Sequence, residues 1–273
     1  MPWEPVPVKP EARKAAFILS ATDQGTFILD RFDYRQNSSG DCIGVGHNLL
    51  NDSAYEPTEI TAAIGVLEMM RELRGTGVVA LDCGANIGVH TVAWARAMTG
   101  WGAVTAFEPQ ERLYYALAGN IALNNCFNAR AHHAAVGASC GTLPIPVPDY
   151  TRPGSFGSLE MRPRPENEDI GQVVDYSPQA SVEVPLVSVD SLALARLDFL
   201  KIDVEAMEME VLTGARQTLC RCRPVIQVEV LKDERALIQP WLEAAGYSVF
   251  GLNANLLAVH ASDPLRRHLH PAA

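Results

Sequence analysis

The sequence lacks the features that mark several common protein classes. No apolar run reaches the ~18–20 residues that a membrane-spanning helix needs, and Met1-Pro2-Trp3-Glu4-Pro5 carries neither the basic nor the apolar region of a signal peptide. Basic residues are also scarce, because 22 Lys and Arg stand against 32 Asp and Glu, a net charge of −10. We therefore expect a small-molecule partner and no nucleic acid or membrane partner, since both of those surfaces are anionic.

Paired cysteines are missing as well. The six cysteines are scattered, and none belongs to a C-x-x-C pair. Cys220-Arg221-Cys222 has the wrong spacing for a standard zinc site. We expect six reduced thiols in a cytoplasmic protein. A homodimer stays an open alternative, because nothing in the sequence decides the oligomeric state.

What the chain does contain is an alternation of apolar strands and amphipathic helices. Helical spacing of apolar residues predicts helices from Thr58 to the glycines at 75 and 77, and around 89–98, 113–121, 211–219 and 237–242, the last with Pro240 inside it. Seven strands are expected at 78–81, 103–107, 129–136, 198–203, 225–230, 247–252 and 256–260. Strands that alternate with helices predict a parallel sheet with helices on both faces, an α/β fold.

Three segments fall outside this alternation. Two short apolar runs at 17–19 and 27–29, separated by Thr22-Asp23-Gln24-Gly25, predict an N-terminal β-hairpin. The polar stretch 35–58 is expected to be a long loop. The proline-rich stretch 141–181 is expected to be an insertion of strands and loops. We divide the chain into an N-terminal arm, hairpin and loop (1–57), a main domain (58–263) with this insertion, and a tail (264–273).

The strongest chemical signal is the loop Leu81-Asp82-Cys83-Gly84-Ala85-Asn86-Ile87-Gly88, which follows a strand and opens a helix. Small residues let a ligand approach the backbone, and free N–H groups at a helix start bind polar groups. Glu108, directly after the second strand, is placed to accept hydrogen bonds from ribose hydroxyls. The loop is not the G-x-G-x-x-G of nicotinamide enzymes. Asp82 would repel a pyrophosphate but suits an amino group, which favours S-adenosylmethionine over NAD.

These motifs resemble the FkbM family of methyltransferases. The resemblance rests on Glu56-Pro57, the glycine loop, Phe107-Glu108-Pro109, Asn120 through Asn124, and the stretch from Leu200 to Glu208 that continues in Val211 to Ala215. It covers roughly residues 55–260. The resemblance implies a class I, Rossmann-like methyltransferase fold, with seven strands of which one is antiparallel near an edge. It also implies S-adenosylmethionine as methyl donor and, for the most part, O-methylation of sugars or natural-product intermediates.

The resemblance also assigns residues to the cofactor. Asp82, Gly84, Asn86 and Gly88 would surround the methionine part, Glu108 would hold the ribose, and Ala135 and Val136 would border the adenine. Ala85, Pro109, Glu56 and Asp203 are further candidate cofactor contacts. One residue departs from the family pattern, because Ala206 stands where the family has glycine. If that position needs a positive φ, alanine costs about 1 kcal/mol or more there.

The candidate catalytic residues are Lys201, Asp203, Glu205 and Glu229, which lie at or near the ends of the fourth and fifth strands. A carboxylate among them is a candidate to take the acceptor's proton or to orient its hydroxyl. Asp203, Glu205 and Glu229 are also the residues that would bind Mg²⁺ if the enzyme uses a metal, which we do not favour. A third interpretation is structural, with the acids paired to Lys201 or capping a helix.

Four functions stay open at this stage. Methyl transfer to a hydroxyl is the leading hypothesis. N-methylation of an amine or amide needs no strong base. A nicotinamide-dependent oxidoreductase is disfavoured by Asp82 and by the glycine spacing. A non-catalytic binding protein would keep the fold without the reaction.

Overall fold

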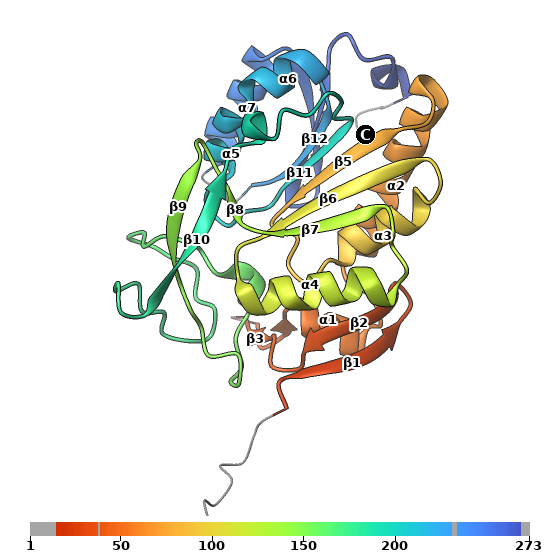
Figure 1. The fold of residues 1–273 in the computed structure, drawn as a ribbon. Helices are drawn as coiled ribbons and strands as arrows, with labels where there is room; N and C mark the ends of the chain where they lie inside the picture. Colours follow the sequence, from red (N-terminus) through yellow and green to blue (C-terminus); the bar gives the residue numbers. More distant parts are fainter. Residues whose placement is uncertain (1–14, 38, 231–233, 269–273) are drawn as a thin grey trace, which may run out of the picture.

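The computed structural model describes residues 15–37, 39–230 and 234–268. Its centre is a seven-stranded sheet in the order β13-β14-β12-β11-β5-β6-β7 (Figure 1). Every neighbouring pair is parallel except those made by β14, which is antiparallel to both β12 and β13. The predicted sheet, with one antiparallel strand next to an edge, is therefore confirmed. Its strands are β5 (Val78–Cys83), β6 (Gly102–Glu108), β7 (Ala129–His133), β11 (Phe199–Ile202), β12 (Val225–Glu229), β13 (Tyr247–Leu252) and β14 (Asn255–His260).

Helices cover both faces of this sheet because successive side chains of each strand point to opposite sides. In β11, Phe199 packs into the apolar cluster formed with α2, α3 and α4, while Leu200 and Ile202 pack into the cluster formed with α5, α6 and α7. The helices are α2 (Pro57–Arg74), α3 (Val89–Ala97), α4 (Glu111–Leu123), α5 (Glu208–Gly214), α6 (Arg216–Cys222) and α7 (Arg235–Ala244). The central strands β5, β11 and β12 are buried along nearly their whole length because helices cover both faces, whereas the edge strand β7 has exposed side chains at Arg130 and His132.

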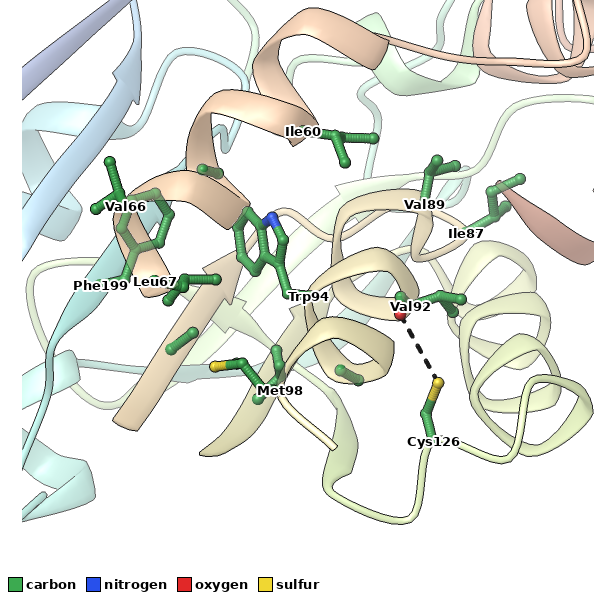
Figure 2. Close-up of a cluster of buried hydrophobic side chains, with 14 of the residues drawn as sticks. Ile60, Val66, Leu67, Ile87, Val89, Val92, Trp94, Met98, Cys126 and Phe199 are labelled. Carbon is green, nitrogen blue, oxygen red and sulfur yellow. Dashed lines mark hydrogen bonds between the residues drawn. The ribbon is translucent and has the colours of Figure 1, made fainter. Parts of the chain in front are cut away.

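Trp94 of α3 lies at the centre of the first cluster, fully buried between α2 and the sheet (Figure 2). Its ring meets that of Phe199 edge to face, with 5.2 Å between centroids. In the same view the thiol of Cys126 points at the carbonyl oxygen of Val92, 3.8 Å away. This contact fixes the loop after α4 against α3, the helix that follows the glycine loop.

The predicted N-terminal hairpin is present as β1 (Phe17–Thr22) and β2 (Gly25–Asp30). The hairpin lies beside α4 (Figure 1), and Asn120 of α4 and Asn124, the residue after this helix, hold it in place. Asn120 accepts a hydrogen bond from the backbone N–H of Ile28 and donates to its carbonyl, and Asn124 does the same with Thr26. Asn120 also donates to the carbonyl of Ile87 at 2.8 Å, so one amide joins the hairpin to the glycine loop.

A second, three-stranded sheet carries the insertion. It contains β8 (Ala135–Val136), β9 (Gly141–Pro146) and β10 (Ser181–Val187), in the order β8-β10-β9. The third strand, predicted within 129–136, is present as β7 and ends at His133. The chain turns at Ala134, and β8 leaves the main sheet to pair in parallel with β10. Between β9 and β10 the chain forms a loop with one short 3-10 turn, η1 (Phe156–Ser158).

The segment 35–58 is not one long loop. It contains the short pair β3 (Arg35–Gln36) and β4 (Cys42–Ile43) and the helix α1 (Val45–Asn51). The helix lacks an adjacent capping side chain. Instead the carboxylate of Asp33 accepts the N–H of Gly46 at 2.9 Å. A cap from a residue so far back along the chain leaves no local signal.

Three smaller points complete the fold. The stripe predicted at 211–219 is divided between α5 and α6, which meet at Ala215, and α7 runs through Pro240 without ending. Two further 3-10 turns are η2 (Val189–Leu192) and η3 (Pro264–His268), and Leu265 of η3 lies in the core. Among the described residues, no helix combines the length and apolarity that crossing a membrane requires.

Candidate active site

A cavity of about 220 Å³ opens at the carboxyl ends of β5, β6, β11 and β12. This is where open α/β sheets bind their ligands. Most sequence-predicted site residues line it: Asp82, Gly84, Ala85, Asn86, Glu108, Pro109, Ala135, Val136, Lys201, Asp203, Glu205 and Glu229. Gly88 and Glu56 are not among the lining residues.

The glycine loop has no room for side chains at two positions. A Cβ on Gly84 would lie 1.6 Å from the carbonyl oxygen of Asp203, and one on Gly88 would lie 2.5 Å from the Leu117 side chain. Both glycines have positive φ, as does Asn86 between them. Gly88 therefore permits the positive φ of the turn and the close packing of the loop against Leu117 of α4. Gly84 lets the loop contact the backbone at the end of β11.

Asp82 is fully buried at the end of β5, and its two oxygens differ. Oδ2 accepts a hydrogen bond from the hydroxyl of Thr91 at 2.6 Å. Oδ1 has no hydrogen bond, and the nearest cation, Lys201 Nζ, lies 3.9 Å away. A buried carboxylate oxygen without a donor is costly unless a ligand supplies one. Asp82 lines the cavity, and its oxygen without a donor suits a ligand's amino group.

Glu108 is held by backbone donors on both oxygens. Oε2 accepts the N–H of Asn86 at 2.9 Å, and Oε1 accepts that of Gln110 at 2.8 Å. Burial raises the pKa of Glu108 to about 7, although both N–H groups oppose the rise. A carboxylate has about four lone-pair sites, so two remain for ribose hydroxyls.

Three acids and one cation converge on the other side of the cavity. Carboxylate oxygens of Asp203, Glu205 and Glu229 all lie within 4.8 Å of one another. Lys201 Nζ donates to Asp203 Oδ2 at 2.6 Å. Burial raises the pKa of Asp203, but the charge of Lys201 and hydrogen bonds from Glu229 and Lys201 outweigh it, so the net pKa is lowered.

The other two acids respond in the opposite direction. The charge of Asp203, followed by burial, raises the pKa of Glu229 to about 10. Burial, followed by the charges of Asp203 and Glu229, raises the pKa of Glu205 well above its ordinary value. Near neutral pH Asp203 is therefore ionised and Glu229 is protonated, and burial beside these acids disfavours a second negative charge on Glu205. Asp203 is paired with Lys201, and Glu208, outside this set, accepts the N–H of Val204 at 3.1 Å.

Two segments that the sequence left without a fixed role form the rest of the wall. Asn48 comes from α1, and Ser155, Gly157, Ser158 and Met161 come from the insertion. Asp33 joins the two segments, because its carboxylate accepts N–H groups from Gly46 of α1 and from Phe156 of η1. Gln110, just before α4, also holds the insertion by donating to the carbonyl of Phe156 at 2.8 Å.

Sequence reasoning missed His90, which lines the cavity from the first turn of α3. Its Nε2 lies 2.9 Å from Oε2 of Glu56, so Glu56 contacts this histidine instead of lining the cavity itself. The available signal was position, because a side chain two residues past the last loop glycine stands in the turn that faces the ligand. His132 and His133, by contrast, lie in β7 away from the cavity lining.

Comparisons with known proteins agree with this geometry. The model of the methyltransferase FkbM domain matches residues 82–249. Methyltransferase 1 of Beauveria bassiana is 27% identical over 182 residues, covering 62% of this chain and 72% of the relative. Methyltransferase sdnD of Sordaria araneosa is 26% identical over 194 residues, covering 62% and 73%.

Among solved structures, methyltransferase FkbM from Methylobacillus flagellatus KT superposes with a TM-score of 0.47 at 14% identity, covering 67% of this chain and 44% of that one. This likeness is too loose to support a statement about function. The family match spans most of the main sheet and includes the glycine loop, Glu108 and the acidic cluster. The chain therefore belongs to the FkbM methyltransferase domain family and is an S-adenosylmethionine-dependent methyltransferase.

Proposed function

We propose that the enzyme methylates a hydroxyl group of a small molecule. One observation carries the proposal. A single cavity is lined by the residues suited to the cofactor and by an acidic cluster in which Asp203 is ionised. The cofactor and the acceptor can then meet within one cavity.

The donor side fits S-adenosylmethionine, which supplies a methyl group activated by a positively charged sulfur. Asp82 Oδ1 has no hydrogen-bond donor and offers a carboxylate oxygen for its amino group. Glu108 keeps lone pairs for the ribose, and the apolar Ala135 and Val136 border a space for the adenine ring. The acidic lining also favours a cationic ligand over an anionic one.

The acceptor side favours a hydroxyl over an amine. Asp203 is ionised and accepts hydrogen bonds, so it can hold an acceptor O–H in a fixed direction. The same negative surroundings would bind an amine as its ammonium form, which has no lone pair to attack a methyl group. A hydroxyl is neutral and keeps its lone pairs in this site.

The size of the cavity supports a small acceptor. Its volume is about 220 Å³, and part of that space belongs to the cofactor. Serines at 155 and 158 and the amide of Asn48 add neutral polar groups to the wall. Such a lining suits a polyhydroxylated compound, which is the chemistry of a sugar or a natural-product intermediate.

The test begins with calorimetric titration of the protein with S-adenosylmethionine, S-adenosylhomocysteine and NAD. We expect micromolar binding of the adenosyl ligands, none of NAD, and a loss of at least about tenfold in Glu108→Ala. A panel of sugars, polyols, phenols and matched amines is then incubated with S-adenosylmethionine and analysed by mass spectrometry. Methyl ethers support the proposal. Methylated amines without ethers, or a failure to bind either adenosyl ligand, would overturn it.

A further inference from the structure

The turn η1 carries two serines whose hydroxyls its own backbone does not use. Ser155 and Ser158 both line the cavity, and their Oγ atoms lie 3.1 Å apart. Ser155 precedes η1, where a serine ordinarily caps the turn, yet its side chain makes no capping hydrogen bond. Within the part of the chain that the structure describes, the two hydroxyls hydrogen-bond only to each other.

A second pair of serines with the same spacing shows the ordinary outcome. Ser188 precedes the turn η2, and Ser191 lies within it. Ser188 Oγ accepts the N–H of Ser191 at 3.2 Å, and Ser191 Oγ donates to the carbonyl of Ser188 at 2.6 Å. Neither residue lines the cavity. Serines at this spacing can therefore satisfy their own turn, and those of η1 remain available for another partner.

Other groups hold the backbone of η1 in place. The N–H of Phe156 donates to the carboxylate of Asp33 at 3.0 Å, and the carbonyl of Phe156 accepts from Gln110 at 2.8 Å. The N–H of Ser155 donates to the carbonyl of Ile170 at 2.8 Å. The side chain of Phe156 is fully buried. The turn is thus fixed on the cavity wall without help from its serine hydroxyls.

The neighbours of Ser158 place it between the two halves of the cavity. Before it, Gly157 lies against the glycine loop, because a Cβ on Gly157 would be 2.9 Å from the amide nitrogen of Asn86. After it, Leu159 belongs to the same apolar cluster as Met207, which follows the acids at the end of β11. Between the cofactor loop and the acidic cluster is the place where an acceptor meets the methyl group.

The pair of hydroxyls suits a neutral hydroxyl as its ligand. One serine donates to the other, so one O–H donor and several lone pairs stay free. An alcohol both donates and accepts, whereas an ammonium only donates and a carboxylate or phosphate only accepts. The ionised Asp203 would also repel either anion. Ser158 is half-buried and Ser155 is 5% exposed, so Ser158 is the member that a ligand reaches.

We propose that Ser158 binds a second hydroxyl of the acceptor, which is not itself methylated, and that Ser155 is its positioning residue. The acceptor is then a diol or polyol. One of its hydroxyls lies at Asp203 for methyl transfer, and a neighbouring hydroxyl hydrogen-bonds to Ser158. This inference rests on hydroxyl methylation as the proposed function and names the class of acceptor.

The first experiment needs no acceptor. Ser155→Ala and Ser158→Ala should leave the Tm within about 1 °C of the unaltered protein, whereas Ser188→Ala, which removes a capping hydroxyl, should lower it by about 2 °C or more. Calorimetric affinity for S-adenosylhomocysteine should stay within about twofold in all three variants, since the lost contact belongs to the acceptor. A loss of Tm in Ser158→Ala as large as in Ser188→Ala makes the hydroxyl structural and overturns the proposal. A tenfold loss of cofactor affinity assigns it to the cofactor and overturns it too.

The second experiment compares a methylated compound from the hydroxyl panel with its analogue that lacks the hydroxyl next to the methylated one. The unaltered enzyme should show a kcat/KM at least about tenfold lower for the deoxy analogue. Ser158→Ala should lose about tenfold on the full compound and almost nothing on the analogue, whose partner hydroxyl is already missing. Ser155→Ala should show the same dependence to a smaller degree. Ser191→Ala should match the unaltered enzyme on both compounds.

This comparison separates the inference from the proposed function. Ethers that form with equal losses on both compounds in Ser158→Ala, or with no loss on either, refute the role of Ser158 and leave hydroxyl methylation standing. Methylation confined to compounds with a single hydroxyl does the same. A panel that yields no ethers overturns hydroxyl methylation and this inference together.

Discussion

A Cβ atom on Gly84 would lie 1.6 Å from the carbonyl oxygen of Asp203, so the cofactor loop and the acidic strand end touch through their backbones. Because Gly84 has no side chain, the glycine loop on the cofactor side of the cavity can approach Asp203 on the acidic side this closely.

Gly84→Ala should therefore be destabilising and should abolish cofactor binding. The strain of φ +83 contributes about 1 kcal/mol, and forcing the two backbones apart adds about 1–3 kcal/mol. Urea unfolding and calorimetry with S-adenosylhomocysteine measure the two effects. Gly100→Ala is the matched control, because Gly100 has φ +81 and nothing within 4 Å of the added atom. Equal losses in both variants would mean that the contact with Asp203 contributes nothing.

Lys201 is a buried cation that forms ion pairs with two acids, Asp82 and Asp203. Lys201→Met should lower the free energy of unfolding by about 3–5 kcal/mol, since it leaves buried negative charge without a partner. Adding Asp203→Asn should recover part of that loss. The control is Arg162→Met, which breaks an exposed pair with Glu210 and should cost less than about 1 kcal/mol. A loss that small in Lys201→Met would contradict the assignment.

Ala206 has φ 69°, the conformation that its family glycine would adopt freely. Ala206→Gly should raise the free energy of unfolding by about 1 kcal/mol. Ala122→Gly, at an exposed position of α4, should lower it by about the same amount. Chemical denaturation of the two variants is the measurement, and effects of the same sign would show that strain at Ala206 is not released by glycine.

Glu108 makes stability depend on pH. Burial raises its pKa from 4.5 to about 7, so between these values the folded state binds more protons than the unfolded state. The free energy of unfolding must then fall as pH rises through this window. Glu108→Gln does not ionise, and its stability relative to the unaltered protein should improve from about pH 5 to about pH 8. Denaturation curves at several pH values give the difference, and parallel profiles would contradict it.

Magnesium should have no effect on the enzyme's stability. Lys201 Nζ already lies 2.6 Å from Asp203 and supplies the positive charge that a cation would bring to the acidic cluster. We expect the Tm to be the same with EDTA and with millimolar Mg²⁺. A rise in Tm with Mg²⁺ that disappears in Asp203→Asn would establish a metal site at the cluster instead.

Periodicity predicted the main sheet well because its central strands are mostly apolar on both faces and the turns around β5 carry glycine. It failed where a distant residue decides the local structure. The helix α1 depends on Asp33 for its first turn, and β8 leaves the main sheet because β10, which follows the insertion, offers it a partner. Neither influence is visible in a window of neighbouring residues.

The candidate site likewise contains residues that the sequence predicts and residues that it does not. Residues such as Asp82, Glu108 and Asp203 follow strands, and parallel strands bring their carboxyl ends to one edge. Asn48 and Ser155 reach the cavity through the positions of α1 and the insertion, which no spacing encodes. His90 could have been found, since its place in the first helical turn follows directly from the glycine loop.

The hydrogen bonds from Asn120 and Asn124 to the hairpin have one further consequence. A two-stranded hairpin normally exposes a row of unpaired backbone groups along each outer edge, which invites another chain to add a strand. On β2, Asn120 and Asn124 satisfy the outward N–H and carbonyl groups of Ile28 and Thr26. These side-chain amides thus take the place of a neighbouring strand without presenting a further strand edge. They protect the outer edge of β2 from pairing with another chain.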